Sequence, residues 1–174
     1  MLSACQPAEN TPTAVNATAT VVPGETAQAN MSDPFSYCAS VGTIDQPDAR
    51  YTGEAKPQSV IQGLMKASGV SSDIPVDTFS QGSSWRCMDG KVYACYVGAN
   101  LPCDSKANTS QDPTVEISAY CEANPTADFI PASITGHDTI FNWKCQDGKA
   151  VAGDQVFHVD AQGYISEIWY PIQP

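Results

Sequence analysis

Apolar side chains recur at helical spacing in residues 57–69. Four of them fall at i, i+1, i+4 and i+5, so they share one face of a helix. These positions are Val60, Ile61, Leu64 and Met65. Pro57 suits the first turn of a helix, and Gly69 suits the position that follows its last turn. The pattern therefore predicts an amphipathic helix that begins near Pro57 and ends at Gly69.

A second segment with helix boundaries lies near residue 113. Asp112 is of a residue type that caps helix N-termini, and Pro113 fits the first helical position. Asn124-Pro125 provides the stop, because proline cannot continue a helix. We expect a helix over 113–123.

Polar and apolar residues alternate around two Asp-Gly pairs. The segment Trp85–Lys91, W-R-C-M-D-G-K, returns 58 positions later as Trp143–Lys149, W-K-C-Q-D-G-K. Asp-Gly between apolar runs is a strong signal for a type I′ hairpin turn, whose two central residues need positive φ. Each copy predicts a β-hairpin, and we expect both tryptophans to pack in the core.

The last part of the chain also alternates, from Gln155–Val159 through a glycine-containing turn to Tyr164–Tyr170. This pattern predicts a third hairpin, so that the second half of the chain ends in a meander of three or four strands. Few helices and strands joined by short turns favour the α+β class with an antiparallel sheet.

The helix and hairpin landmarks indicate an internal duplication. Pro57 and Pro113 are 56 positions apart, and so are Ile74-Pro75 and Ile130-Pro131. The Trp-Cys hairpins follow at 58, so two residues are inserted in the second copy. We therefore predict two helix-plus-hairpin units, at about 57–100 and 113–174, within a single folded domain of residues 34–174.

The first 33 residues differ in composition from the rest. Leu2-Ser3-Ala4-Cys5 resembles a bacterial lipobox, in which the cysteine carries the lipid, and residues 1–5 are interpreted as its remnant at the end of a signal peptide. Residues 6–33 are rich in Pro, Thr, Ala and Asn and hold almost no large apolar side chains. Such a segment buries too little surface to fold, so we expect a disordered tether.

The negative net charge of the chain disfavours nucleic acids and anionic lipid surfaces as partners. The chain of 174 residues has a net charge of −11, with only eight Lys and Arg. A nucleic-acid binder needs a basic face, and anionic lipid headgroups also attract basic segments. We therefore expect a protein or small-molecule ligand at the cell surface, with contact to the membrane only through a lipid on Cys5.

Seven cysteines favour an oxidising, extracytoplasmic compartment. With Cys5 lipidated, six remain, and six allow 15 pairings. The duplication favours a helix-to-hairpin link, Cys121–Cys145, and leaves Cys38–Cys87 and a short loop closed by Cys95–Cys103. The cysteine spacings match no common zinc pattern and include no C-x-x-C. We expect disulfides and no metal or cofactor.

The sequence offers few candidate catalytic residues. His137 precedes Asp138, while His158 and Asp160 would share one face of a strand, so either histidine is a candidate base. Neighbours on a strand point to opposite faces, so His137 and Asp138 seldom form a useful contact. A loop histidine at 137 and an exposed polar residue at 158 are the favoured interpretations. Motifs of serine hydrolases, zincins and nucleotide-binding proteins are absent from the sequence.

One long connection between the two units is a candidate binding loop. Residues 98–112 are mostly small and polar, with a cysteine near the middle. Loops of this kind often carry binding residues, although a plain linker has the same composition. The candidates are Asn100, Leu101, Lys106 and Asn108.

The lipobox-like start and the W-x-C-x-D-G-K hairpins resemble small bacterial envelope lipoproteins of unknown function. The hairpins, at about 85–97 and 143–157, are also similar to those of the membrane-bound inhibitors of c-type lysozyme. That resemblance implies a small antiparallel β-domain with a cysteine ahead of a D/N-G turn, and it transfers no inhibitory residues because the helices and the duplication depart from that family.

The sequence therefore favours a non-enzymatic, extracytoplasmic lipoprotein or secreted binding domain. In one version it inhibits a cationic hydrolase, since the net charge would favour that association. The alternative is a small hydrolase that uses His137 or His158.

Overall fold

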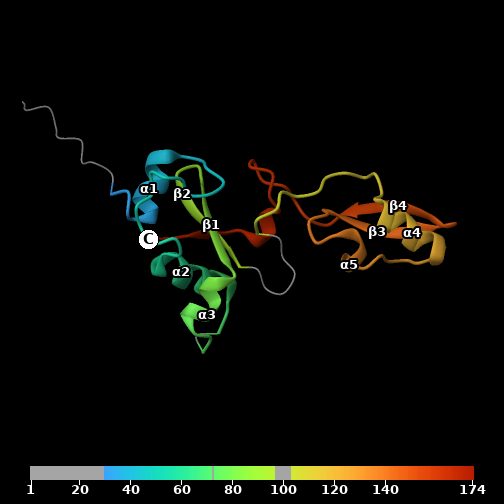
Figure 1. The fold of residues 1–174 in the computed structure, drawn as a ribbon, viewed down its shortest axis with the longest axis horizontal. Helices are drawn as coiled ribbons and strands as arrows, with labels where there is room; N and C mark the ends of the chain where they lie inside the picture. Colours follow the sequence, from blue (N-terminus) through green and yellow to red (C-terminus); the bar gives the residue numbers. More distant parts are fainter. Residues whose placement is uncertain (1–29, 72, 97–102) are drawn as a thin grey trace, which may run out of the picture.

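The helices and strands form two units placed end to end along the molecule (Figure 1). The structure, a computed structural model, describes residues 30–71, 73–96 and 103–174. The first unit contains α1 (Pro34–Val41), α2 (Gln58–Ser68), α3 (Val76–Gln81), β1 (Ser83–Met88) and β2 (Lys91–Tyr96). The second contains α4 (Val115–Ala123), α5 (Ala132–Thr135), β3 (Phe141–Gln146) and β4 (Lys149–Gln155). The chain ends with a 3₁₀ turn, η1 (Ser166–Ile168), and β5 (Tyr170–Ile172). The α+β class with antiparallel sheets is confirmed.

Helix α2 follows its predicted pattern. Pro57 is the N-cap, and Gly69 ends the helix in the left-handed region with φ of 68°. The apolar stripe is buried, as expected, and packs into the core of the first unit. The N-terminus of α4 lies two residues later than predicted: Thr114 caps it by accepting a hydrogen bond from the Ile117 amide at 3.3 Å.

Both Asp-Gly pairs form the predicted hairpin turns. Asp89 and Gly90 have φ of 51° and 74°, and Asp147 and Gly148 have 51° and 76°. Positive φ at both central residues is what a type I′ turn requires. The hairpins β1–β2 and β3–β4 are antiparallel and contain no other residues in their turns.

The predicted meander in the second half is wrong. Residues 156–165 form one isolated bridge, Val159 with Ile165, and β5 pairs with β2 of the first unit instead of β4. Ile165 and Ile168 are both buried at a spacing of three, which suits a 3₁₀ turn rather than a strand. The chain thus forms two sheets, β1-β2-β5 and β3-β4, and its C-terminal segment returns to the first unit.

All three predicted disulfides are present. Cys38–Cys87 links α1 to β1, Cys121–Cys145 links α4 to β3, and Cys95–Cys103 closes a short loop. The two helix-to-hairpin links have the same Cα–Cα distance of 5.2 Å.

The backbone around these two links repeats as well. The amide of Cys87 donates to the carbonyl of Ile44, six residues after the helix cysteine, and the amide of Cys145 donates to that of Ala127, again six residues after. In the first unit, the helix joined to the hairpin in this way is α1, which precedes the predicted unit of 57–100. The counterpart of α4 in this motif is therefore α1 rather than α2.

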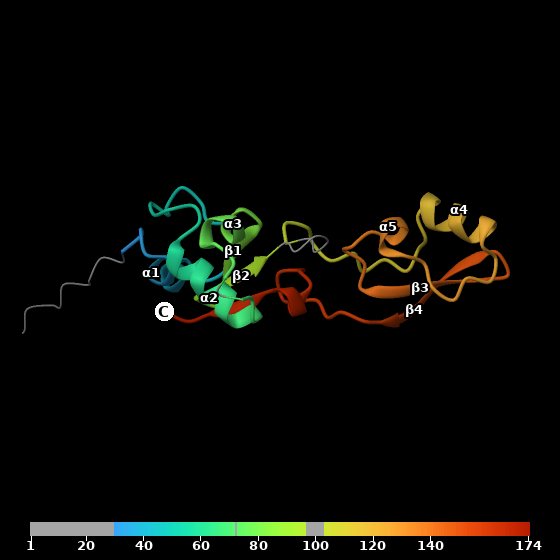
Figure 2. The same ribbon diagram turned by 90° about the horizontal axis from the view of Figure 1, so that it is seen from below.

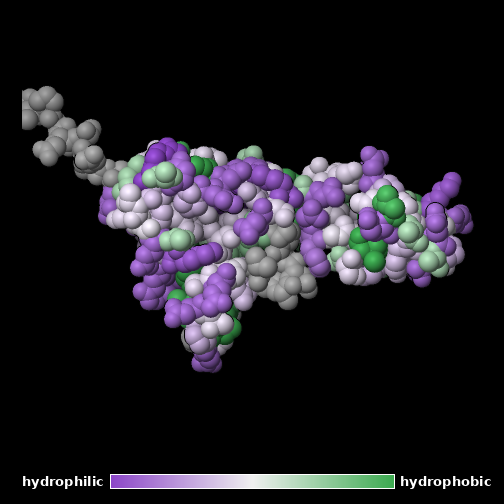
Figure 3. Space-filling model, in the orientation of Figure 1, coloured by the Kyte–Doolittle hydropathy of each residue, from purple (hydrophilic) through white to green (hydrophobic). Residues whose placement is uncertain are grey.

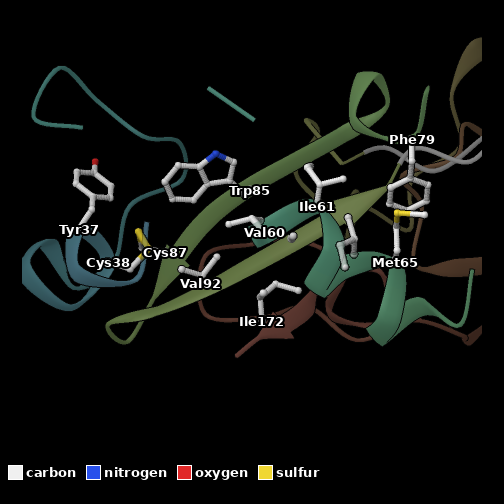
Figure 4. Close-up of a cluster of buried hydrophobic side chains, with 12 residues drawn as sticks. Tyr37, Cys38, Val60, Ile61, Met65, Phe79, Trp85, Cys87, Val92 and Ile172 are labelled. Atoms are coloured by element: carbon white, nitrogen blue, oxygen red, sulfur yellow. A yellow bond between two sulfur atoms is a disulfide. The ribbon is translucent and has the colours of Figure 1, made fainter. Parts of the chain in front are cut away.

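Three clusters of buried side chains hold the described chain together. The largest lies between α1, α2 and the first sheet, with Trp85 beside the Cys38–Cys87 link (Figure 4). A second cluster surrounds Trp143 and Cys145 in the second unit. The third joins the units: Cys95 and Cys103 pack with Ile140 and with residues of the C-terminal segment.

The two helices of the second unit cover one side of its sheet. Helices α4 and α5 lie on the same side of β3 and β4 (Figure 2). On the face shown in Figure 3, hydrophilic residues predominate, with a hydrophobic area over the second unit. Among the large apolar residues that stay exposed, Val115 and Phe129 are 81% and 61% exposed.

Candidate functional site

A cleft with a volume of about 540 Å³ opens beside the loop of residues 44–56. Its lining comes from that loop, from β1, from the residues after the Cys95–Cys103 link and from the C-terminal segment. The lining residues are Asp45, Gln46, Pro47, Asp48, Tyr51, Gly53, Ala55, Lys56, Ser84, Trp85, Cys103, Asp104, Tyr164 and Trp169. The volume falls in the range of small-molecule sites.

The 44–56 loop is held at several points. Ile44 pairs with Cys87 on the outer edge of β1, and the Thr52 amide donates to the Met31 carbonyl at 3.0 Å. The Asp48 amide donates to the hydroxyl of Tyr37 at 3.0 Å, and the indole N–H of Trp85 donates to the Ala55 carbonyl at 2.9 Å. One wall of the cleft is thus fixed to the core of the first unit.

Two carboxylates of the cleft have cationic partners. Asp45 lies 2.5 Å from Nζ of Lys106, and a hydrogen bond from that ammonium lowers the pKa of Asp45. Asp48 is bound by Arg50 at 2.6 Å, and the hydrogen bonds from Arg50 lower the pKa of Asp48 to about 2. A third carboxylate, Asp104, accepts from the hydroxyl of Ser84 at 3.0 Å.

A buried guanidinium lies behind the cleft. Arg86 has no exposed surface, and it forms an ion pair with Asp160 and donates to the Gln162 side chain at 2.8 Å. Its guanidinium carbon lies 4.4 Å from the ring centre of Tyr164 and 4.3 Å from that of Trp169. These distances permit cation–π attraction. Arg86 therefore fixes two aromatic rings that line the cleft.

Lys106 contacts one of these two rings, Tyr164. Its Nζ lies 3.8 Å from the ring centre of Tyr164 and donates to the Gln162 carbonyl at 2.5 Å. Burial works against the charged form of Lys106, but its contacts with Asp45 and Tyr164 outweigh that effect and raise its pKa. Lys106, predicted as a binding-loop residue, thus does not line the cleft but contacts two residues that do, Asp45 and Tyr164.

Three buried side-chain polar atoms of the described chain lack a hydrogen-bond partner, and all belong to the cleft or its immediate support. They are Oη of Tyr51, Nε of Arg86 and Nε1 of Trp169. Tyr51 and Trp169 line the cleft, and Arg86 stacks on Trp169. Burial raises the pKa of Tyr51, so its hydroxyl stays protonated and able to donate. Unsatisfied buried donors are rare and often mark functional regions.

The other predicted binding-loop residues lie elsewhere. Asn108 forms a bridge with Thr139, where its amide donates to the Asp138 carbonyl at 2.7 Å, so it connects the loop to the second unit. Asn100 and Leu101 lie outside the described residues, as do Cys5 and residues 6–29 of the predicted tether.

The histidines do not enter the cleft. His158 pairs with Glu167, Nδ1 to Oε1 at 2.7 Å, while Asp160, its expected partner, binds Arg86. The bonds from His158 outweigh burial and lower the pKa of Glu167. His137 is exposed beside an apolar hollow of about 370 Å³ in the second unit. In the described part of the chain, neither imidazole ring forms a hydrogen bond with a hydroxyl group.

Sequence reasoning missed Tyr51, Arg86 and Trp169 as members of one site. Arg86 lies in the repeated motif, but its counterpart Lys144 is also basic, so the motif does not distinguish a buried cation from a surface one. The partners of Arg86 lie more than 70 residues away in sequence.

Over residues 30–71, 73–96 and 103–174, none of the helices has the length and apolar character that a membrane span requires. Across the same ranges, no group of three or more His, Cys, Asp or Glu side chains is placed to hold a metal ion. Comparisons of the chain with protein-family models, curated proteins and solved structures find no match.

Proposed function

We propose that this protein is a non-enzymatic binding domain that takes its ligand in the cleft beside the 44–56 loop. The observation that carries the proposal is the cleft of about 540 Å³ itself, whose lining and support hold three buried polar atoms without a partner: Tyr51 and Trp169 line the cleft, and Arg86 supports it. Leaving such a group without a partner costs about 1–3 kcal/mol, so the protein keeps these groups against a cost to its stability.

Two of the three carboxylates of the cleft, Asp45 and Asp48, support binding rather than catalysis. A general acid or base needs a pKa near the working pH. The pKa values of Asp45 and Asp48 are both lowered by their cationic partners, which moves these groups away from that range. Their role in this proposal is to hold the wall of the cleft and to accept hydrogen bonds.

The three disulfides indicate an oxidising, extracytoplasmic environment. Within that setting we propose that Cys5 carries a lipid and that residues 6–29 form a tether, which would place the cleft away from the membrane surface. The predicted end of the tether at residue 33 is wrong, because Met31 packs against the core of the first unit and Asp33 caps α1. Replacing Cys5 with Ser tests the anchor: the wild type should fractionate with membranes and the variant with the soluble fraction. Equal fractionation would overturn the anchor and favour secretion.

A thermal-shift screen tests the binding function. Wild-type protein is heated with neutral oligosaccharides, amino acids and basic peptides, and a cleft ligand at about a hundredfold its Kd should raise the Tm by about 5 °C or more. The cleft variant K56A/D104A should lose the shift. The control D128A/K149A, which removes the same charges from exposed positions of the second unit, should keep it. A screen without any shift, or a shift that both variants keep, would refute the cleft as the binding site.

The net charge of −11 favours a second candidate function, inhibition of a cationic hydrolase. Association with a basic enzyme would then slow as salt rises, because screening weakens the attraction. Titration against basic hydrolases, c-type lysozyme among them, at low and high salt tests this version. Full hydrolase activity at a large excess of the protein would exclude it.

One contact supports the alternative hypothesis that the protein is a small hydrolase. In the His158–Glu167 pair, a carboxylate orients an imidazole. Turnover of ester, amide and glycoside substrates by the wild type, lost in H158A or H137A, would establish a hydrolase. Turnover that both variants retain would assign the activity to a contaminant.

A further inference from the structure

The charged side chains around the cleft balance one another. Three carboxylates and one ammonium group line the cleft, and two cations outside the lining form ion pairs with two of these carboxylates, so the six groups together carry no net charge. The carboxylates are Asp45, Asp48 and Asp104, and the cations are Arg50, Lys56 and Lys106. This local balance differs from the protein as a whole, which carries −11.

The cleft offers donors and acceptors side by side. The ammonium of Lys56 donates to the Ser83 carbonyl and has two further protons to donate. The carboxylate of Asp104 accepts from Ser84 and has further acceptor sites. A ligand hydroxyl both donates and accepts hydrogen bonds. A ligand with several hydroxyls can therefore bond to both Lys56 and Asp104 without carrying a charge.

The inner lining adds apolar surface. Trp85, Tyr164 and Trp169 are buried rings that line the cleft, and Tyr51 is partly exposed beside them. Two rings form an edge-on pair, Tyr51 and Trp85, with centres 4.9 Å apart. Sugars combine hydroxyl groups with apolar C–H faces, and both features have complements here.

From these features we infer that the cleft binds a neutral saccharide. The inference rests on the proposed function and adds the class of ligand: a short, uncharged oligosaccharide whose hydroxyls contact Lys56, Ser84 and Asp104. A cationic ligand would be repelled by Lys56 and an anionic ligand by Asp104, so neither sign of charge is favoured by both groups. A neutral polyol meets neither penalty.

An array of neutral oligosaccharides, followed by isothermal titration with the retained sugar, tests the ligand class. The Kd should change by less than about twofold between about 20 mM and about 500 mM NaCl, because a neutral ligand releases no counterions. K56A/D104A should weaken binding by about tenfold or more through the loss of hydrogen bonds. The control D128A/K149A should stay within about twofold of the wild type.

The possible failures separate the two proposals. A retained basic peptide whose affinity falls with salt and with K56A/D104A would overturn the saccharide and keep the cleft as a binding site. A sugar that binds both variants equally would place saccharide binding elsewhere and overturn the cleft. Sugars tested at about 20 mM reveal Kd values in the millimolar range. Absence of binding by every sugar at that concentration would refute a saccharide as the ligand.

Discussion

The ion pair of Arg86 and Asp160 gives a stability prediction that follows from burial. Both side chains are shielded, at 0% and 8% exposure, and they join β1 to the C-terminal segment. Replacing Asp160 with Asn leaves the guanidinium buried without an anion, and removing one partner of such a pair costs about 3–5 kcal/mol. We expect D160N to lower the free energy of unfolding by about that amount.

The double variant R86M/D160N separates the energy of the ion pair from the cost of losing each side chain alone. R86M loses cation–π contacts worth about 0.5–2 kcal/mol each, while Asp160 keeps backbone donors in Gln162 and Tyr164 at 2.8 and 3.0 Å. R86M/D160N removes both charges, so it should be about 1–2 kcal/mol more stable than D160N alone.

Urea unfolding followed by tryptophan fluorescence measures these differences, with D154N, at an exposed position of β4, as the control. D154N should stay within about 0.5 kcal/mol of the wild type. A D160N cost below about 1 kcal/mol, or a double variant as costly as the two single variants together, would refute the buried pair.

Three further predictions concern local contacts. A Cβ on Gly53 would clash with the hydroxyl of Tyr51 and a neighbouring carbonyl, so Gly53→Ala should cost about 1–3 kcal/mol in a thermal melt and weaken cleft binding; unchanged values of both would contradict this geometry. Thr114→Ala should cost about 1 kcal/mol because it removes the cap of α4, whereas Asp112→Ala, at the position predicted as the cap, should have little effect; the reverse order in urea unfolding would return the cap to Asp112. The pKa of Asp48 is lowered to about 2, below its ordinary value of about 3.9, so its contacts stabilise the loop fully above about pH 4 and are lost as pH falls through about 2. Exchange of the Tyr51 amide, which donates to the Asp48 carbonyl, should therefore gain protection as pH rises across that window in the wild type and not in D48N.

Local rules explain what the sequence predicted well. Asp-Gly needs only its own φ preference to form a hairpin turn, and the apolar stripe of α2 needs only helical spacing. The disulfide pairing could be predicted because the two hairpins are similar in sequence and because a helix packed on its own sheet brings Cys121 to Cys145.

The remaining features depend on distant partners. β5 pairs with β2 across more than 70 residues, and neither strand carries a local signal for that pairing. The burial of Arg86 depends on Asp160, Tyr164 and Trp169, which its own segment does not specify. The candidate site was unpredictable for the same reason, because its lining comes from four separate parts of the chain.

The indole N–H signals of the three tryptophans test the central claim most directly. Trp85 and Trp169 line the cleft, whereas Trp143 lies in the second unit with its N–H bound to Thr139 at 3.2 Å. In a titration followed by ¹⁵N–¹H correlation spectra, we expect the ligand to shift the signals of Trp85 and Trp169 and to leave that of Trp143 in place. A ligand that shifts Trp143 and leaves the other two unchanged would move the binding site to the second unit and contradict the account.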